Sequence, residues 1–290
     1  MNLKNDDRRY AYLLIFSMLL WGGGWTALKI LTTAMPVDVV IFWRFFLMSL
    51  AFLPILYFFK IPLTLTQGSF KYILGSSFLN IAFMVFSFLG IKYGLAGAGS
   101  VIITTFSPIM TFLLVAVIFR SRLSTRQYFG LLLGLVGGYV LLQLNNFSLF
   151  LHGSNIYFLL CALIWAGVTL LSQHSQKHIH PVYYSFLISL IATFFSFLYA
   201  FNADLGAVFT QGVKFWTALI YLAVLGQTVA TTIFFIASGK LGSQRTSSFM
   251  FLVPFFALFS AWFILDEPLQ LHIVIGGLIS MFAVYFINKK

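Results

Sequence analysis

The chain consists of ten long apolar runs separated by short polar connections, and this pattern restricts it to a membrane. Each run has about 20 residues, the length that an α-helix needs to cross the hydrocarbon core of a bilayer. The runs lack the alternation that marks a membrane-spanning β-strand. Only 8% of the residues are charged, against about 25% in a soluble domain. The pattern predicts an all-α integral membrane protein whose connections are too short for a soluble domain.

The positions of the basic residues predict how the spans are oriented. We place the spans at residues 11–33, 37–58, 71–91, 97–118, 126–144, 155–173, 181–201, 215–238, 245–265 and 271–288. Of the 17 Lys and Arg residues, 13 lie at the termini or in even-numbered connections, three lie in or beside odd-numbered ones, and Arg44 lies within a span. Because basic connections stay on the cytoplasmic side, we expect both termini to be cytoplasmic.

Two glycine-rich stretches lead into a proline within a span, and they lie half a chain apart, at Tyr93–Pro108 and Gly239–Pro254. Glycine lets helices approach closely, and proline removes a helical hydrogen bond. Inside a membrane such a break persists only where protein or a water-filled cavity satisfies the backbone. The predicted hinge residues are Gly97, Gly99, Pro108, Gly242 and Pro254.

Further correspondences extend this similarity over both halves of the chain. Trp21 recurs at Trp165 and Asn80 recurs at Gln227, with an offset that stays between 144 and 147 residues. Each half has five spans, an odd number, so the halves must cross the membrane in opposite directions. Such inverted repeats are typical of transporters, with the solute site near the membrane midplane. The predicted fold is two inverted five-helix repeats, residues 1–146 and 147–290.

Three motifs resemble those of a known family. Trp21, Gly22 and Trp25 match the pattern W-G-x-x-F/W in the first span, and Arg44-Phe45 matches an R-F pair in the second. The glycine-rich stretches before proline match a third motif. With these motifs the sequence resembles the ten-helix branch of the drug/metabolite transporter superfamily, the EamA-type exporters.

The resemblance implies a secondary transporter of the bacterial inner membrane that exports a small organic metabolite, such as an amino acid, by alternating access. It implies neither enzymatic activity nor a cofactor. We expect a small-molecule solute and membrane lipid as partners, no nucleic acid, and a monomer or homodimer. In the family an acidic residue usually follows each proline of the third motif. Glu267 matches it in the second half, whereas Ser121 takes its place in the first.

Arg44 is the sharpest candidate for a solute contact. It lies roughly 10 Å below the outer surface, at a rise of about 1.5 Å per residue. A charge at this depth costs several kcal/mol unless it is paired or hydrated. Arg44 can therefore anchor a carboxylate or phosphate of the solute. Alternatively, its side chain extends to the interface or bonds to backbone carbonyls.

The aromatic and amide candidates each have a structural alternative. Trp21, Trp25 and Trp165 either line an aromatic cavity, which would suit an amphipathic solute, or pack in the core. Asn80 and Gln227 either bind the solute or hydrogen-bond between helices.

Two further candidates complete the set. Lys29 lies near the outer end of its span, where it can contact solute or extend to the interface. Thr105 can satisfy the backbone before the proline or contact solute. The predicted solute-binding residues are Arg44, Trp21, Trp25, Asn80, Trp165, Gln227, Lys29 and Thr105.

The positions of acids and histidines argue against other chemistries. All six acidic residues lie at or outside the span ends. Because proton-coupled carriers usually keep a carboxylate or His inside the bundle, we expect facilitated diffusion or exchange without a proton relay. His174, His178 and His180 have a spacing that could bind metal, but no Cys or carboxylate accompanies them, so a solvated loop is favoured.

Three alternative functions stay open at this point. The first is uptake rather than export, because the sequence carries no thermodynamic direction. The second is an intramembrane lipid-modifying enzyme, which would need clustered acids or nucleophiles at one depth. The third is a partner subunit that does not itself transport.

Overall fold

The computed structural model describes residues 5–93, 96–141, 153, 155–266 and 271–289, and these residues form helices without any strand. The first half contains α1 (Asn5–Ala34), α2 (Val37–Phe58), η1 (Gln67–Ser69), α3 (Phe70–Tyr93), α4 (Ala96–Phe119) and α5 (Thr125–Leu141). The second half contains α6 (Asn155–Ser175), α7 (Pro181–Tyr199), η3 (Leu205–Thr210), α8 (Val213–Ile220), η4 (Tyr221–Val229), α9 (Ala230–Leu241), α10 (Ser243–Ser248), η5 (Phe249–Leu252), α11 (Val253–Leu265) and α12 (Leu271–Asn288).

Nine helical segments of the described residues are long and apolar enough to cross a membrane. Two of them are composite: α8, η4 and α9 form Val213–Leu241, and α10, η5 and α11 form Ser243–Ile264. The helix α5, with 17 described residues, lies beside these nine and packs along α12. The prediction of an all-α membrane protein is confirmed, while a tenth span stays a prediction.

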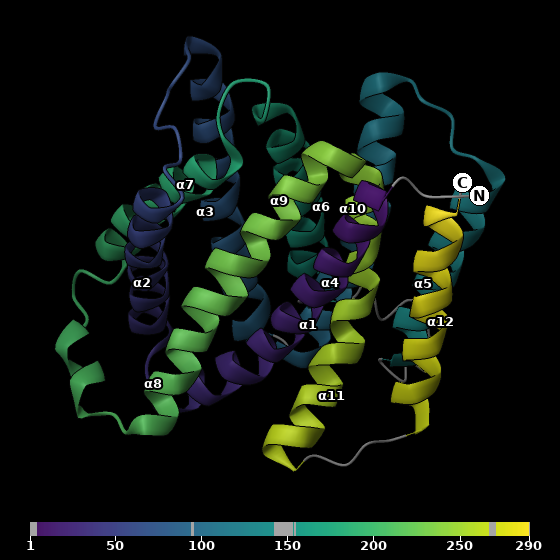
Figure 1. The fold of residues 1–290 in the computed structure, drawn as a ribbon. Coiled ribbons are helices and arrows are strands. Elements are labelled where there is room, and N and C mark those ends of the chain that lie inside the picture. The colour runs from purple at the N-terminus through teal and green to yellow at the C-terminus, as the bar shows by residue number, and fades with distance from the viewer. Residues whose placement is uncertain (1–4, 94–95, 142–152, 154, 267–270, 290) are drawn as a thin grey trace.

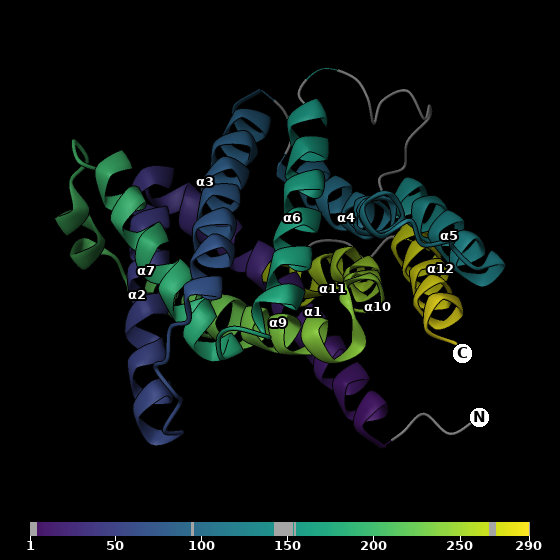
Figure 2. The ribbon, with the colours of Figure 1, turned by 90° about the horizontal axis from the view of Figure 1, so that it is seen from above.

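Two helix pairs form opposite edges of the bundle. The α2–α7 pair lies at one edge and the α5–α12 pair at the other, with α1, α3, α4, α6 and α9 between them (Figures 1 and 2). The beginning of α1 and the end of α12 meet at the same end of the bundle, where Arg245 contacts Asp7 and Asn288. This end, marked by these three residues, is called the termini end below.

Glycine allows the α5–α12 pair to pack backbone against backbone. A Cβ atom at Gly276 would lie 2.6 Å from Leu141 Cγ, and one at Gly130 would overlap Ile287. Small residues at helix interfaces permit this approach, which is a main source of packing energy in membranes. Increasing residue numbers on α5 meet decreasing numbers on α12, so the two helices are antiparallel.

The two proline-containing spans differ, although the sequence predicts breaks in both. The helix α4 continues through Pro108, and Ser107 Oγ bonds to the carbonyl of Ile103 at 2.6 Å. Its counterpart is divided into α10, η5 and α11, and Pro254 lies in the first turn of α11. At the start of this divided segment Gly242 has φ +88°, a conformation that favours glycine. Of these two spans, therefore, only the one in the second half is divided into separate helical segments.

Candidate functional site

The structure brings the two repeat-related tryptophans together in the middle of the bundle. The rings of Trp21 on α1 and Trp165 on α6 meet edge to face, with centroids 5.5 Å apart. Phe234 on α9 contacts both rings, at 5.0 and 6.2 Å, and Phe83 on α3 contacts Trp165 at 5.7 Å. Trp21, Trp165, Phe234 and Phe83 are called the tryptophan cluster below. Both tryptophans are half-buried, so they retain surface that a solute can reach.

Two buried nitrogen donors in the predicted site have no acceptor among the described residues. These are Arg44 Nε on α2 and Trp165 Nε1 on α6. The guanidinium of Arg44 lies over the Phe45 ring, with 4.7 Å between Arg44 Cζ and the ring centroid. A buried donor without a partner costs about 1–3 kcal/mol, more when it is charged. An incoming acceptor, such as a carboxylate, would recover this free energy.

The two predicted amides lie on α3 and η4. Asn80 Nδ2 donates to the carbonyl of Ser76 in its own helix, at 2.8 Å. Gln227 lies in η4, a nine-residue π-helix, and its amide forms no hydrogen bond among the described residues. Neither amide therefore links two described helices. Both keep hydrogen-bonding capacity that could serve a solute.

The sequence did not predict the π-helix. Thr228 Oγ1 bonds to the carbonyl of Ala223, five residues earlier, at 3.0 Å, and approaches the carbonyl of Met48 on α2 at 3.4 Å. Such π-segments frequently occur at functional sites. The repeat offset rises from 144 at Trp21 and Trp165 to 147 at Asn80 and Gln227, but the connection between α7 and α8 lies in the same stretch, so the offset does not locate the π-helix.

Several other predicted residues are not part of the tryptophan cluster. Some of them pack against neighbouring helices instead. Trp25 is half-buried against the main apolar core. Lys29 is exposed on α1, and Thr105 is buried on α4 against Gly138 of α5. A Cβ atom at Gly99 would lie 2.5 Å from the ring of Phe158, so this glycine admits an aromatic side chain. Gly97 lies among the residues whose surroundings the structure does not describe.

A layer of buried polar side chains lies between the tryptophan cluster and the termini end. Ser172 Oγ on α6 and Ser238 Oγ on α9 are 2.8 Å apart. Ser76 on α3 bonds to the hydroxyl of Tyr184 on α7, which is fully buried. These four residues are called the hydroxyl layer; Ser172 follows Trp165 along α6, and Ser238 follows Phe234 along α9. Their hydrogen bonds join α6 to α9 and α3 to α7.

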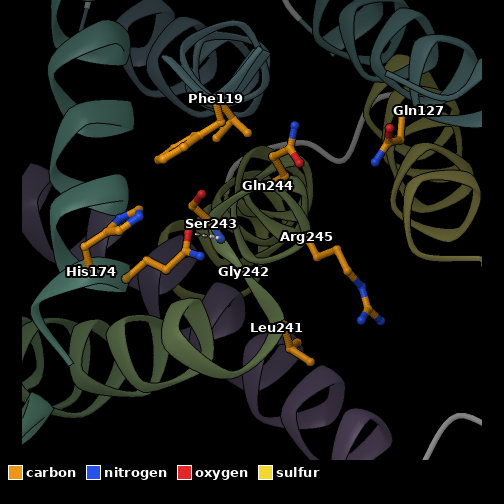
Figure 3. A pocket seen from close by; sticks show the side chains of 10 residues that line it. Phe119, Gln127, His174, Leu241, Gly242, Ser243, Gln244 and Arg245 are labelled. Carbon is orange, nitrogen blue, oxygen red and sulfur yellow. Dashed lines mark hydrogen bonds between the residues drawn. The ribbon is translucent and has the colours of Figure 1, made fainter. Parts of the chain in front are cut away.

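Beyond the hydroxyl layer, a pocket of about 410 Å³ opens around α10 at the termini end (Figure 3). Gln173 Oε1 accepts a hydrogen bond from the backbone of Ser243, at 2.9 Å. The ring of His174 stacks on Phe119, with centroids 5.4 Å apart. The side chain of Arg245 points away from His174 (Figure 3) and pairs with Asp7 at 3.4 Å. Sequence reasoning missed this pocket, because it used the basic residues only as topology signals.

The three histidines between α6 and α7 make separate packing contacts, unlike the solvated loop that the sequence favoured. His174 stacks on Phe119, and His178 stacks on Tyr72 of α3. His180 Nδ1 accepts from the backbone of Val182 at the beginning of α7, and burial lowers the pKa of His180. No group of three His, Cys, Asp or Glu that could hold a metal occurs within the described part of the chain.

Comparisons with known proteins assign the family. Residues 8–143 and 153–289 each match the EamA-like transporter family. A probable amino-acid metabolite efflux pump of Salmonella typhimurium is 27% identical over 293 residues, which cover 96% of this chain and 94% of that relative. An uncharacterized transporter of Archaeoglobus fulgidus is 25% identical over 288 residues, which cover 96% of each chain.

A solved crystal structure shares the fold. It superposes with a TM-score of 0.80, covering 97% of this chain and 96% of that one, at 16% sequence identity. The two family matches span almost all of a chain whose described helices are long and apolar enough to cross a membrane repeatedly. This protein is therefore a multi-pass membrane protein that belongs to the EamA-like transporter family.

Proposed function

We propose that the protein exports a small organic solute bearing a carboxylate, such as an amino acid, across a bacterial inner membrane. The observation that carries this proposal is the pair of buried donors, Arg44 Nε and Trp165 Nε1, which lack an acceptor among the described residues. A solute carboxylate supplies acceptors for such donors, and bonds to a charged donor are the stronger ones. The names of the efflux-pump relatives support the same solute class and direction.

The contacts between the halves support two inverted five-helix repeats as the framework of this carrier. Gly130 corresponds to Gly276 and Leu141 to Ile287, both at an offset of 146 residues. Gly130 packs against Ile287, and Gly276 packs against Leu141, so the two contacts exchange under the correspondence. Reciprocal contacts of this kind are the signature of a two-fold axis.

Two further contacts join residues that correspond to each other. Trp21 touches Trp165, and Ser49 Oγ lies 3.0 Å from Thr193 Oγ1, each pair being 144 residues apart. A residue can meet its own counterpart only on the two-fold axis itself. These pairs support an axis that passes through the tryptophan cluster and the α2–α7 pair, so the two repeats share the proposed solute site.

We further propose that the termini end faces the cytoplasm. The basic residues cluster in the connections of this side, which favours that orientation. The hydroxyl layer then separates the tryptophan cluster from the cytoplasm, and solute loading requires that Ser172 and Ser238 part. No acidic side chain of the described helices lies next to Arg44. This arrangement supports exchange or facilitated diffusion over a built-in proton relay.

Counterflow in proteoliposomes tests the proposed carrier. Vesicles loaded with mixed amino acids should take up labelled Phe, Thr or a dicarboxylate saturably. Arg44→Ala should weaken the apparent affinity by about tenfold to a hundredfold, because a charged hydrogen bond is worth about 1.5–3 kcal/mol. Lys214→Ala, which removes an exposed cation at the beginning of α8, serves as the matched control and should leave uptake unchanged. Equal uptake by both variants would contradict the role of Arg44.

A further inference from the structure

A groove at the α2–α7 edge of the bundle has no role in the proposed carrier. It encloses about 740 Å³ between the end of α2 and the beginning of α7. Its lining includes Leu53, Leu56, Tyr57, Lys60, Tyr183 and Phe186. The pair forms one edge of the bundle (Figures 1 and 2), so the groove borders the space that lipid fills around the protein.

The groove lies at the end of α2 and the beginning of α7, and the proposed orientation places these helix ends near the cytoplasmic boundary of the bilayer. The connection after α2 is tied to the connection before α7, because Thr66 Oγ1 donates to the carbonyl of His178 at 3.1 Å. The first connection follows the last turn of α2, and the second precedes the first turn of α7. A molecule in the groove therefore meets apolar side chains toward the membrane centre and polar groups toward the water.

Lys60 holds an unfavourable backbone conformation at the mouth of the groove. Its φ is +48°, a region that side-chain-bearing residues rarely adopt. The helix ends in a Schellman motif: the amide of Ile61 bonds to the carbonyl of Leu56 at 3.1 Å, and that of Lys60 to Tyr57 at 3.2 Å. Glycine is the residue that this position usually takes. A lysine here costs conformational free energy that a glycine would not.

The chemistry of the lining matches an anionic phospholipid. Leu53, Leu56 and Phe186 offer an apolar surface on which an acyl chain can lie. The Lys60 ammonium at the mouth complements a phosphate, and basic pockets between membrane helices are known to bind acidic headgroups. Tyr57 and Tyr183 add aromatic rings with hydroxyls, which favour the headgroup level of a bilayer.

We propose that this groove binds one anionic phospholipid, with its phosphate on Lys60 and an acyl chain along Leu53, Leu56 and Phe186. The site is separate from the tryptophan cluster and does not depend on which solute is carried. It commits to a lipid rather than a free phosphate, because most of the lining is apolar.

Lys60→Gly tests the proposal without endangering the fold, since glycine relieves the strain at this helix end. The unfolding temperature of purified protein in a neutral detergent should rise when phosphatidylglycerol is added. The variant should unfold at the same or a higher temperature than the wild type without lipid, and should lose most of the lipid-dependent rise. Native mass spectrometry should show at least tenfold weaker binding of phosphatidylglycerol.

Arg120→Gly is the matched control. Arg120 follows α4 with φ +50° and lies outside the groove, so this variant should keep the full lipid-dependent rise. A second pair probes the acyl site: Leu53→Trp should fill the groove and weaken binding, whereas Leu50→Trp, one turn away, should not. Three results would overturn the proposal: an undiminished rise in Lys60→Gly, an equal rise with glycerol phosphate, or a groove covered by a second copy of the chain.

Discussion

Two buried nitrogen atoms set the proposed site apart at the scale of single residues. Four buried hydroxyl oxygens of the described residues also lack a hydrogen-bond partner, those of Ser77, Thr231, Thr232 and Thr246, but they are neutral and can rotate. Trp43 Nε1, by contrast, donates to the carbonyl of Leu205 at 2.9 Å. Arg44 Nε and Trp165 Nε1 have no such partner among the described residues. Unpaired donors weaken the fold unless a ligand uses them, so they identify where a solute gains most from binding.

The substitution Trp165→Phe tests whether the solute uses the N–H of Trp165. The substitution removes an N–H that the fold does not use, so the unfolding temperature should change little. Solute affinity should fall roughly fivefold, the equivalent of about 1 kcal/mol for one neutral hydrogen bond. Trp43→Phe is the control, because its N–H is already bonded: it should lower stability by about 1 kcal/mol and leave affinity unchanged. The reverse pattern, in unfolding scans and counterflow, would remove Trp165 from the site.

The predicted site residues that lie together in the structure were identified from the repeat and not from their residue type alone. Trp21 and Trp165 could be paired in advance because they occupy equivalent positions in two related halves. The surroundings of Lys29 and Thr105 could not be predicted in the same way. A helix that is apolar all round carries no amphipathic signal, so its rotation about its own axis is not encoded in a readable pattern.

At the scale of elements, the departures from regular α-helix inside the spans predicted from the sequence lie in the second half of the described chain. Here η4 is a π-helix, and α10, η5 and α11 divide what α4 leaves whole. The spans themselves could be predicted, because runs of about 20 apolar residues dominate the free energy of insertion. The departures from regular α-helix could not be predicted, because they depend on which backbone carbonyl accepts the hydrogen bond of each backbone amide.

Two glycine substitutions should have opposite effects on stability. Gly242→Ala places a Cβ at φ +88°, which should destabilise the protein by about 1–2 kcal/mol. Gly226→Ala lies in η4, where an added Cβ would meet Leu222 at 3.7 Å, an ordinary contact, and it should stabilise by about 0.5–1 kcal/mol. Thermal unfolding in one detergent measures both. Equal shifts would mean that the turn at Gly242 is not strained by a side chain.

At the scale of the whole molecule, related halves that meet through corresponding residues account for the architecture. The α5–α12 and α2–α7 edges each pair one helix with its counterpart, and the centre pairs Trp21 with Trp165. Several glycines, among them Gly130 and Gly276, pack against side chains of the other half. The fold class could be predicted from the sequence because every span repeats the same apolar signal, and the family because motifs such as Trp21-Gly22 and Arg44-Phe45 resemble those of its members. The hydroxyl layer could not, because single serines and tyrosines are common in membrane helices.

Reporter fusions test the proposed orientation of the halves. Alkaline phosphatase folds only outside the cytoplasm, so a fusion after Asp204, in the connection between α7 and α8, should be active. A fusion after Arg122, between α4 and α5, should be inactive, and green fluorescent protein at the C-terminus should fluoresce. Activity at Arg122 would show that the charge bias misassigns the termini end.

The contrast between α4 and its divided counterpart has a mechanical consequence. When a sideways force acts on a continuous helix such as α4, the helix bends slightly along its whole length and stores the energy as elastic strain. A divided helix bends most easily at one place, which here is η5 (Phe249–Leu252), between α10 and α11. Equal forces on the two halves would therefore produce unequal displacements. Two halves that correspond in sequence would then move unequally. The half that contains α4 would stay nearly fixed, while the half that contains α10 and α11 would undergo most of the movement.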